Sequence, residues 1–194
     1  MKLLADNLSG RTFRILMFPL LILTFAALFL ACTEKPRFFF DFEADKDLDD
    51  LVWKCKTLFR ISDQHATSWS RSLKVLLYPD PDNTGEHYPG IGFNRFNPDW
   101  SSYSSLCFDA FNPEEKALSL VVRIDDCKNP DFPDRYNKAI ILVPGANHVS
   151  LPLNSLITSG TKKRLNLARI EGVMLFLSNP KERHTIFLDR VLVE

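Results

Sequence analysis

The segment SLVVRIDD (119–126) alternates apolar and polar positions with a period of two residues, which is typical of a β-strand with one buried face. Arg123 and Asp125 fall together on the face opposite the apolar positions. Short runs of this kind, bounded by turn residues, recur ten times along the chain, at 37–43, 54–61, 72–79, 90–96, 105–111, 117–125, 137–143, 147–153, 172–178 and 184–194. Only 45–53 and 153–160 have a helical pattern, and each is short.

About ten short strands and little helix predict an all-β antiparallel sandwich or jelly roll over residues 37–194. A chain of this length can close such a core without disulfides. The residues that we expect to point into the core are Phe39, Leu58, Leu73, Val75, Phe108, Leu120, Val122, Ile124, Ile141, Leu175 and Phe187.

The first 31 residues have a different character from the rest of the chain. Residues 1–14 carry three basic side chains, and residues 15–31 are seventeen uncharged, mostly apolar positions. A basic segment followed by an apolar run and a small residue is typical of an export signal. The run is shorter than the ~20 residues of a spanning helix and contains Pro19, so a removed signal is favoured over a permanent membrane anchor. Residues 32–36 would be a short linker.

Charge and cysteine usage narrow the function classes. Without residues 1–31, the 24 basic and 24 acidic side chains of the chain become 21 and 23, a net charge of −2. This charge gives no electrostatic footprint for nucleic acid. Cys55 and Cys107 each lie inside a strand-like run, so we expect both to be small core residues and not part of a disulfide framework.

The end of the apolar run, LFLAC (28–32), resembles the lipobox of bacterial lipoproteins, in which a small residue precedes a cysteine that receives lipid. Ala31 fits the position before the cysteine, whereas Phe29 and Leu30 depart from the commonest residues. The resemblance implies acylation of Cys32 and an exported lipoprotein held at a membrane, on the periplasmic or cell-surface side. The alternative is an ordinary cysteine in an uncleaved membrane helix.

Seven segments together resemble the galactose-binding-like jelly rolls, in particular the carbohydrate-binding modules of exported bacterial proteins. They are FDFE, SLKVLLYP, DWSSYSSLCFDAFNP, LSLVVRIDD, DRYNKAIILVPGANHVSLPL, LNLARIEGVMLFL and TIFLDRVLVE, in that order along residues 37–194. Complex I assembly proteins share the scaffold without binding sugars, so the fold alone does not decide the function.

The resemblance implies a structural calcium between the first and last strands. The matching carboxylates are Asp41, Glu43 and Asp189, and calcium prefers several such oxygen ligands. Arg190 stands where such modules often carry another Asp or Asn, so Arg190 pairing with Glu43 or Asp41 is the alternative to the metal.

The resemblance also implies a ligand site on the concave sheet face and its rim. Sugars are held by aromatic rings and by paired polar side chains that read hydroxyl groups. The candidates are Arg123, Asp125, Asp126, Asp134, Arg135, Tyr136, Trp100 and Tyr88. The alternative is a structural ion-pair network in which Arg123 pairs with Asp125 or Asp134. Removing an accessible Arg123 would lower the free energy of unfolding by less than ~1 kcal/mol. Removing a buried Arg123 that holds the strands together would lower it by ~3–5 kcal/mol.

These observations predict a non-catalytic carbohydrate-binding module of the bacterial cell envelope that is lipid-anchored through Cys32 and binds a polysaccharide or glycan. The alternative is an envelope assembly or protein-interaction domain, which would show a larger exposed apolar patch. The sequence contains no Gly-x-Ser-x-Gly, His-Glu-x-x-His or phosphate-binding glycine loop. A two-carboxylate glycosidase is the remaining enzymatic alternative.

Overall fold

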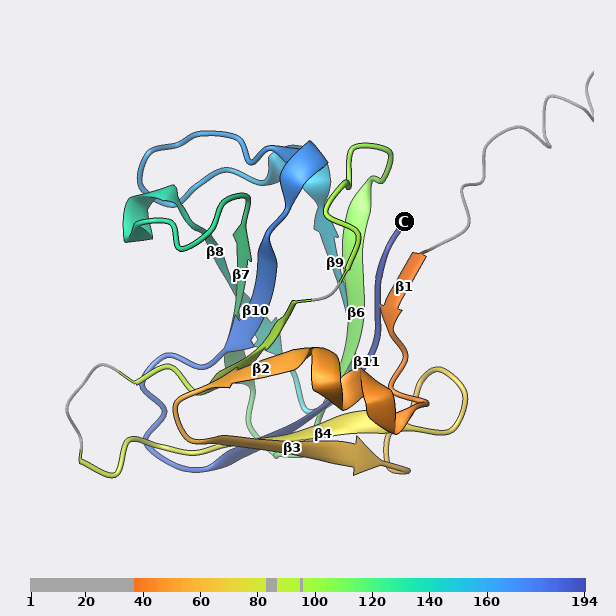
Figure 1. Ribbon diagram of the computed structural model, residues 1–194. Helices are drawn as coiled ribbons and strands as arrows, with labels where there is room; N and C mark the ends of the chain where they lie inside the picture. The colour runs from red at the N-terminus through yellow and green to blue at the C-terminus, as the bar shows by residue number, and fades with distance from the viewer. Residues whose placement is uncertain (1–36, 83–86, 95) are drawn as a thin grey trace, which may run out of the picture. The chain divides into compact units, whose positions relative to one another are not determined.

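Two antiparallel β-sheets and one apolar core between them make up the described part of the chain (Figure 1). The computed structural model describes residues 37–82, 87–94 and 96–194. The expected signal or anchor at 1–31, the acylated Cys32 and the linker 32–36 lie outside the described residues. Within the described ranges, no helix is both long and apolar enough to cross a membrane.

The strands divide between a six-stranded and a five-stranded sheet. In the six-stranded sheet the order is β3 (Thr57–Ser62), β4 (Ser72–Leu77), β11 (His184–Val193), β6 (Ser105–Asn112) and β9 (Gly145–Pro152), and β1 (Arg37–Phe40) pairs with β11. In the five-stranded sheet the order is β2 (Leu51–Lys54), β5 (Gly90–Phe93), β10 (Gly172–Phe176), β7 (Leu118–Asp125) and β8 (Tyr136–Leu142). This arrangement confirms the predicted antiparallel sandwich.

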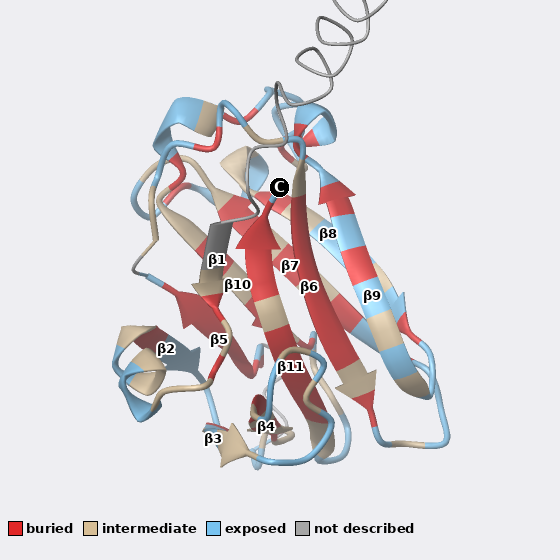
Figure 2. Cartoon of the chain, turned by 90° about the vertical axis from the view of Figure 1, so that its right-hand side faces the viewer, coloured by how far each residue is buried: buried red, intermediate tan, exposed pale blue. Residues whose placement is uncertain are grey.

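The core forms where the inward positions of both sheets meet. Strands β6 and β11 are buried over most of their length (Figure 2). Of the predicted core residues, Leu73, Val75, Phe108, Leu120, Val122, Ile124 and Leu175 are buried in the core, and Phe39 is partly buried against it. Phe187 is also buried, but on the opposite side of β11, where its ring contacts His65 of the loop between β3 and β4. Leu58 and Ile141 were predicted wrongly, because they are 57% and 61% exposed. Both lie on the outer faces of edge strands: Ile141, for example, pairs with the outward-facing Ser119.

The two predicted helical segments are shorter than expected. Residues 45–53 form a six-residue 3-10 helix, η1 (Asp45–Asp50), and the chain then enters strand β2. Cys55 turns the chain between β2 and β3 with a φ of 53° and is exposed, so its predicted core position is wrong, whereas Cys107 is buried as expected. Residues 153–160 contain only the 3-10 helix η3 (Leu153–Ser155). Two further 3-10 helices are η2 (Phe132–Asp134) and η4 (Leu167–Arg169).

Candidate functional site

The outward face of the five-stranded sheet carries a row of side chains that crosses all five strands. On β10, Met174 pairs with Gly92 of β5 on one side and with Arg123 of β7 on the other. The row continues to Val52 on β2 and to Asn137 on β8. Because successive residues of a strand point to opposite faces, all five of these residues share the face turned away from the core.

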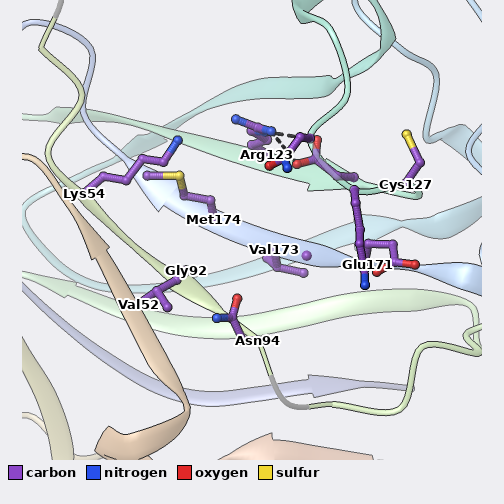
Figure 3. A pocket seen from close by; sticks show the side chains of 13 residues that line it. Val52, Lys54, Gly92, Asn94, Arg123, Cys127, Glu171, Val173 and Met174 are labelled. Atoms are coloured by element: carbon purple, nitrogen blue, oxygen red, sulfur yellow. Dashed lines mark hydrogen bonds and ion pairs between the residues drawn. The ribbon is translucent and has the colours of Figure 1, made fainter.

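A groove of about 370 Å³ follows this row on the sheet face (Figure 3). It is lined by Val52, Lys54, Gly92, Asn94, Arg123, Asp125, Cys127, Lys128, Asn129, Glu171, Gly172, Val173 and Met174. Apolar and polar groups are thus mixed along its length.

Gly92 forms part of the floor and faces outward on β5. A Cβ atom on Gly92 would approach Cγ2 of Val52 to 2.8 Å. Gly90, the other outward glycine of β5, lies outside the groove lining, and a Cβ there would clash with the carbonyl oxygen of Leu175 and with Cβ of Phe176. Glycine at position 92 therefore keeps the groove open between β2 and β10.

Arg123 and Asp125 form a paired contact in the groove wall. Nε of Arg123 donates to Oδ1 of Asp125 at 3.0 Å, and Nη2 lies 2.6 Å from Oδ2. Such a fork-shaped contact fixes both side chains in a defined orientation. The two side chains are 13% and 15% exposed, so a part of each remains accessible from the groove.

One end of the outward face is aromatic. Phe176 pairs with Gly90 and faces outward, and the ring of Tyr88 packs against it edge to face with centroids 5.8 Å apart. Tyr88 is 41% exposed. Two aromatic rings on the face that carries the groove supply the apolar contacts that sugar rings use.

The groove itself has a polar end. Asn94, Lys128 and Asn129 line it, and Glu171 hydrogen-bonds through its backbone amide to the carbonyl of Asp125 at 2.8 Å. The carboxylate of Glu171 lies 3.4 Å from Nε of Arg169. Amides, ammonium groups and carboxylates here offer both donors and acceptors.

Three of the predicted ligand residues anchor loops instead of lining the groove. The carboxylate of Asp126 accepts a hydrogen bond from the amide of Asn166, and that of Asp134 accepts one from the hydroxyl of Thr161, each at 2.7 Å. Nε of Arg135 donates to the carbonyl of Pro130 at 2.9 Å. A ligand role for Asp126, Asp134 and Arg135 stays a prediction, and as placed they order the loops beside the groove.

Trp100 and Tyr136 were predicted to line the ligand site, but both are buried in the core. Trp100 is fully buried, its indole donates to the carbonyl of Asn97, and its ring stacks on Phe39. Tyr136 pairs with Ile124 on the core-facing side of its sheet and is 6% exposed. Burial raises the pKa of its hydroxyl. Both rings are therefore directed away from the groove face.

Sequence reasoning missed several groove residues, among them Lys54, Asn94, Glu171 and Met174. Assigning them needs the pairing register of β2, β5 and β10, which alternation within a single strand does not reveal. One local signal was present: glycines at alternate positions of the strand GIGF (90–93) indicate a close approach of another group to the backbone.

Two of the carboxylates proposed for calcium hold the β3–β4 loop (residues 63–71). Asp189 is buried and accepts hydrogen bonds from the amides of Thr67 and Ser68, each at 2.7 Å. Glu43 accepts from the amides of Ser70 at 3.0 Å and Arg71 at 2.7 Å. Burial raises the pKa of Glu43, but these hydrogen bonds outweigh it, so that the pKa lies below its ordinary value.

In this arrangement Glu43 and Asp189 contact different residues of the loop, and Asp41 accepts a hydrogen bond from the amide of Glu43 at 3.2 Å. The described residues contain no group of three or more His, Cys, Asp or Glu placed to hold a metal ion. Arg190 pairs with neither Asp41 nor Glu43, since its guanidinium lies 3.6 Å from Asp109. Calcium binding at Asp41, Glu43 and Asp189 stays a prediction.

Solved structures with the same arrangement of strands include carbohydrate-binding modules. A family 11 carbohydrate-binding module from Clostridium thermocellum, in complex with a β-1,3-1,4-mixed-linked tetrasaccharide, superimposes with a TM-score of 0.63. The match covers 81% of this chain and 94% of that one, at 13% identity. The chain has the jelly-roll fold of carbohydrate-binding modules. The galactose-binding-like fold expected from the sequence is thus confirmed.

Agarases contain a similar domain. An exo-β-agarase structure matches with a TM-score of 0.61 and 16% identity over 81% of this chain and 25% of that chain. In sequence, the chain is 24% identical over 145 residues to β-agarase B of Vibrio sp. (strain JT0107). The match takes in 66% of this chain and spans only 15% of the length of that relative. No family model matches the sequence.

Proposed function

We propose that residues 37–194 form a non-catalytic carbohydrate-binding module that holds a glycan in the groove of the five-stranded sheet. The observation that carries the proposal is the Arg123–Asp125 pair beside Met174, above a floor kept open by Gly92. The fold shared with a tetrasaccharide-bound module supports it.

The groove chemistry suits a sugar better than a purely apolar ligand. Arg123, Asn94 and Lys54 can donate to ring and hydroxyl oxygens, and Asp125 and Glu171 can accept from hydroxyl groups. The apolar C–H surfaces of a sugar ring would lie against Met174 and the outward aromatic pair of the same face.

The carboxylates of the groove favour binding over hydrolysis. A glycosidase needs one carboxyl group that keeps a proton and donates it to the leaving oxygen. Both carboxylates that line the groove are engaged in ion pairs, Asp125 with Arg123 and Glu171 with Arg169. The weak likeness to an agarase therefore supports a sugar-binding role for this domain more than a catalytic one.

A protein-interaction role is the second candidate, and one observation favours it. On β8, at the edge of the five-stranded sheet, Ile141 is 61% exposed, and Val143, just beyond it, is 52% exposed. Exposed apolar side chains along an edge strand are typical of a surface that pairs with another chain.

We also propose that the module is exported and tethered to a bacterial membrane by lipid at Cys32, facing the periplasm or the cell surface. The support is the basic and apolar pattern of residues 1–31 and the LFLAC segment.

A glycan array with the domain 33–194 tests the binding function. Both sheets and the core lie within residues 37–194, so we expect this domain to fold alone. We expect the wild-type domain to retain neutral β-linked oligosaccharides, and Arg123→Ala, checked for folding by its thermal melt, to lose them. A folded wild-type domain that binds no glycan on the array would contradict the proposal.

A further inference from the structure

Trp69 is the most exposed of the large apolar side chains that the structure describes. It is 85% exposed and lies in the β3–β4 loop. Its sequence neighbours anchor this loop, whereas the Trp69 side chain points into solvent. The other two tryptophans differ: Trp100 is fully buried, and Trp53, 62% exposed, contacts Phe59 with ring centroids 6.1 Å apart. An indole with almost its whole surface in water needs a reason, because burying aromatic surface is favourable.

The loop holds Trp69 outward between two anchored serines. On one side, the amide and hydroxyl of Ser68 donate to Asp189, each at 2.7 Å. On the other, the amide and hydroxyl of Ser70 donate to Glu43 at 3.0 and 2.9 Å. Trp69 itself has a φ of 55°, a left-handed conformation that is uncommon for a bulky residue. The fold thus maintains an unfavourable backbone conformation at the residue whose ring it exposes.

The surroundings of Trp69 are acidic and polar. A hollow of about 530 Å³ is lined by Asp41, Glu43, Trp69 and Ser70. Oδ1 of Asp41 accepts from the amide of Glu43 at 3.2 Å, which leaves Oδ2 available as an acceptor for a ligand hydroxyl. Burial, together with the negative charge of Asp41, raises the pKa of the neighbouring Asp47.

The negative charge of Asp41 and Glu43 favours some classes of ligand in the hollow over others. Carboxylates repel an anionic membrane surface and an anionic polysaccharide, whereas they accept hydrogen bonds from the hydroxyl groups of a neutral sugar. An aromatic face beside such acceptors provides the two kinds of contact that a sugar ring needs.

We propose that Trp69, with Asp41, forms a second glycan-contact site, which stacks the indole on a neutral sugar ring. This site is separate from the groove, because the two hollows share no lining residue. The proposal rests on the proposed function in that both sites would take glycans. Two sites on one module would raise its retention on a polysaccharide above that of either site alone.

The test uses fluorine NMR of the domain 33–194 labelled with 5-fluorotryptophan. The chain has three tryptophans, so the spectrum has three resonances, which Trp69→Phe and Trp53→Phe assign. Agaro-oligosaccharides and the β-1,3-1,4-mixed-linked tetrasaccharide are the probes. We expect a saturable shift of the Trp69 resonance with one of them and no shift at Trp53, the matched exposed control.

The same titration in Arg123→Ala separates the two sites. We expect the shift at Trp69 to persist when binding in the groove is lost. If wild-type protein binds a probe calorimetrically through Arg123 while Trp69 stays silent, the second site is refuted and the groove stands. A shift at Trp69 with neutral lipid vesicles but with neither sugar would refute it in favour of a membrane contact. No response to either probe by calorimetry or NMR would count against both sites.

Loss of folding does not confuse this result. Because Trp69 is almost fully exposed, we expect Trp69→Phe and Trp69→Ala to melt within about 2 °C of the wild type, as for surface substitutions. A retention assay on insoluble agarose then measures the gain from two sites. We expect Trp69→Ala to elute at least about tenfold more readily than Trp53→Ala.

Discussion

Arg123 contributes to the stability of the fold through its ion pair with Asp125 and, in the proposed function, to glycan binding. The sequence suggested an accessible arginine whose removal costs below ~1 kcal/mol. With side chains only 13% and 15% exposed, the Arg123–Asp125 pair lies between a surface pair and a buried one. We therefore expect Arg123→Ala to lower the free energy of unfolding by about 1–3 kcal/mol, between the small cost of a surface change and the ~3–5 kcal/mol of breaking a fully buried pair.

A double-mutant cycle with Asp125→Ala, measured by chemical denaturation, checks this cost. The double variant should lose less than the sum of the single variants, because removing both partners leaves no unpaired charge. Arg123→Lys should keep most of the stability but bind glycans more weakly, since lysine cannot make the two-pronged contact. Additive single costs, or wild-type binding by Arg123→Lys, would contradict the paired geometry as the basis of recognition.

Glu43 makes the stability of the β3–β4 loop depend on pH. The pKa of Glu43 is lower in the folded protein than its ordinary value, so its contribution is fully present above the ordinary glutamate pKa of about 4.3 and is lost as the pH falls through the folded pKa. We expect Glu43→Gln to flatten the fall in melting temperature between about pH 5 and pH 3. Parallel melting curves for the variant and the wild type over that range would show that Glu43 does not anchor the loop through its charge.

At the scale of single elements, strand β5 keeps the groove open through Gly92. Gly92→Leu would place a side chain between Val52 and Met174 without removing any polar contact. The closest atom to the new Cβ would be Cγ2 of Val52, at 2.8 Å, which can rotate away, and the backbone oxygen of Val173, at 3.5 Å, is at an ordinary contact distance. We expect glycan affinity to fall at least tenfold by calorimetry while the melt shows a folded domain. Ser119→Leu, on the outward side of β7 but outside the groove lining, is the control, and an equal loss in both variants would speak against a floor at Gly92.

The strands were largely predictable from the sequence, and their pairing was not. Alternation in β7 identified Arg123 and Asp125 as outward-facing, because that pattern is local. Cys55 was wrongly predicted to lie in the core, because the pattern from 54 to 61 resembles one strand. In the structure a turn with positive φ at Cys55 interrupts that segment. Trp100 and Tyr136 were predicted at the rim of the ligand site but lie in the core. An aromatic residue near a turn can occupy either place, and only long-range packing decides which.

The β3–β4 loop is the element at which calcium, if bound, would act. Its anchors are the carboxylates Glu43 and Asp189, which now accept hydrogen bonds from the loop itself. If a calcium ion joins them, added calcium should raise the melting temperature of the domain by mass action, and a chelator should lower it. Identical melts in both conditions would show that hydrogen bonds alone hold the loop, and Asp41→Asn should then leave the melt unchanged.

At the scale of the whole molecule, the location of the protein depends on Cys32. We expect Cys32→Ala to leave the chain unprocessed or to release it from the membrane fraction, because acylation contributes ~0.8 kcal/mol of membrane affinity per buried CH₂. Fractionation and the electrophoretic mass of the expressed protein measure this. If wild type and variant are both uncleaved and equally membrane-bound, residues 15–31 are a spanning anchor and not a signal.

Strand β11 has a consequence for how the molecule is made. It lies in the middle of the six-stranded sheet and pairs with β1, β4 and β6, which come from three widely separated parts of the chain. None of those pairings can form until residues 184–193 have left the ribosome. Until then the chain lacks its complete six-stranded sheet, and β11 does not yet cover the apolar faces of β4 and β6. A premature stop before residue 184 would therefore yield an aggregation-prone fragment and not a smaller folded module.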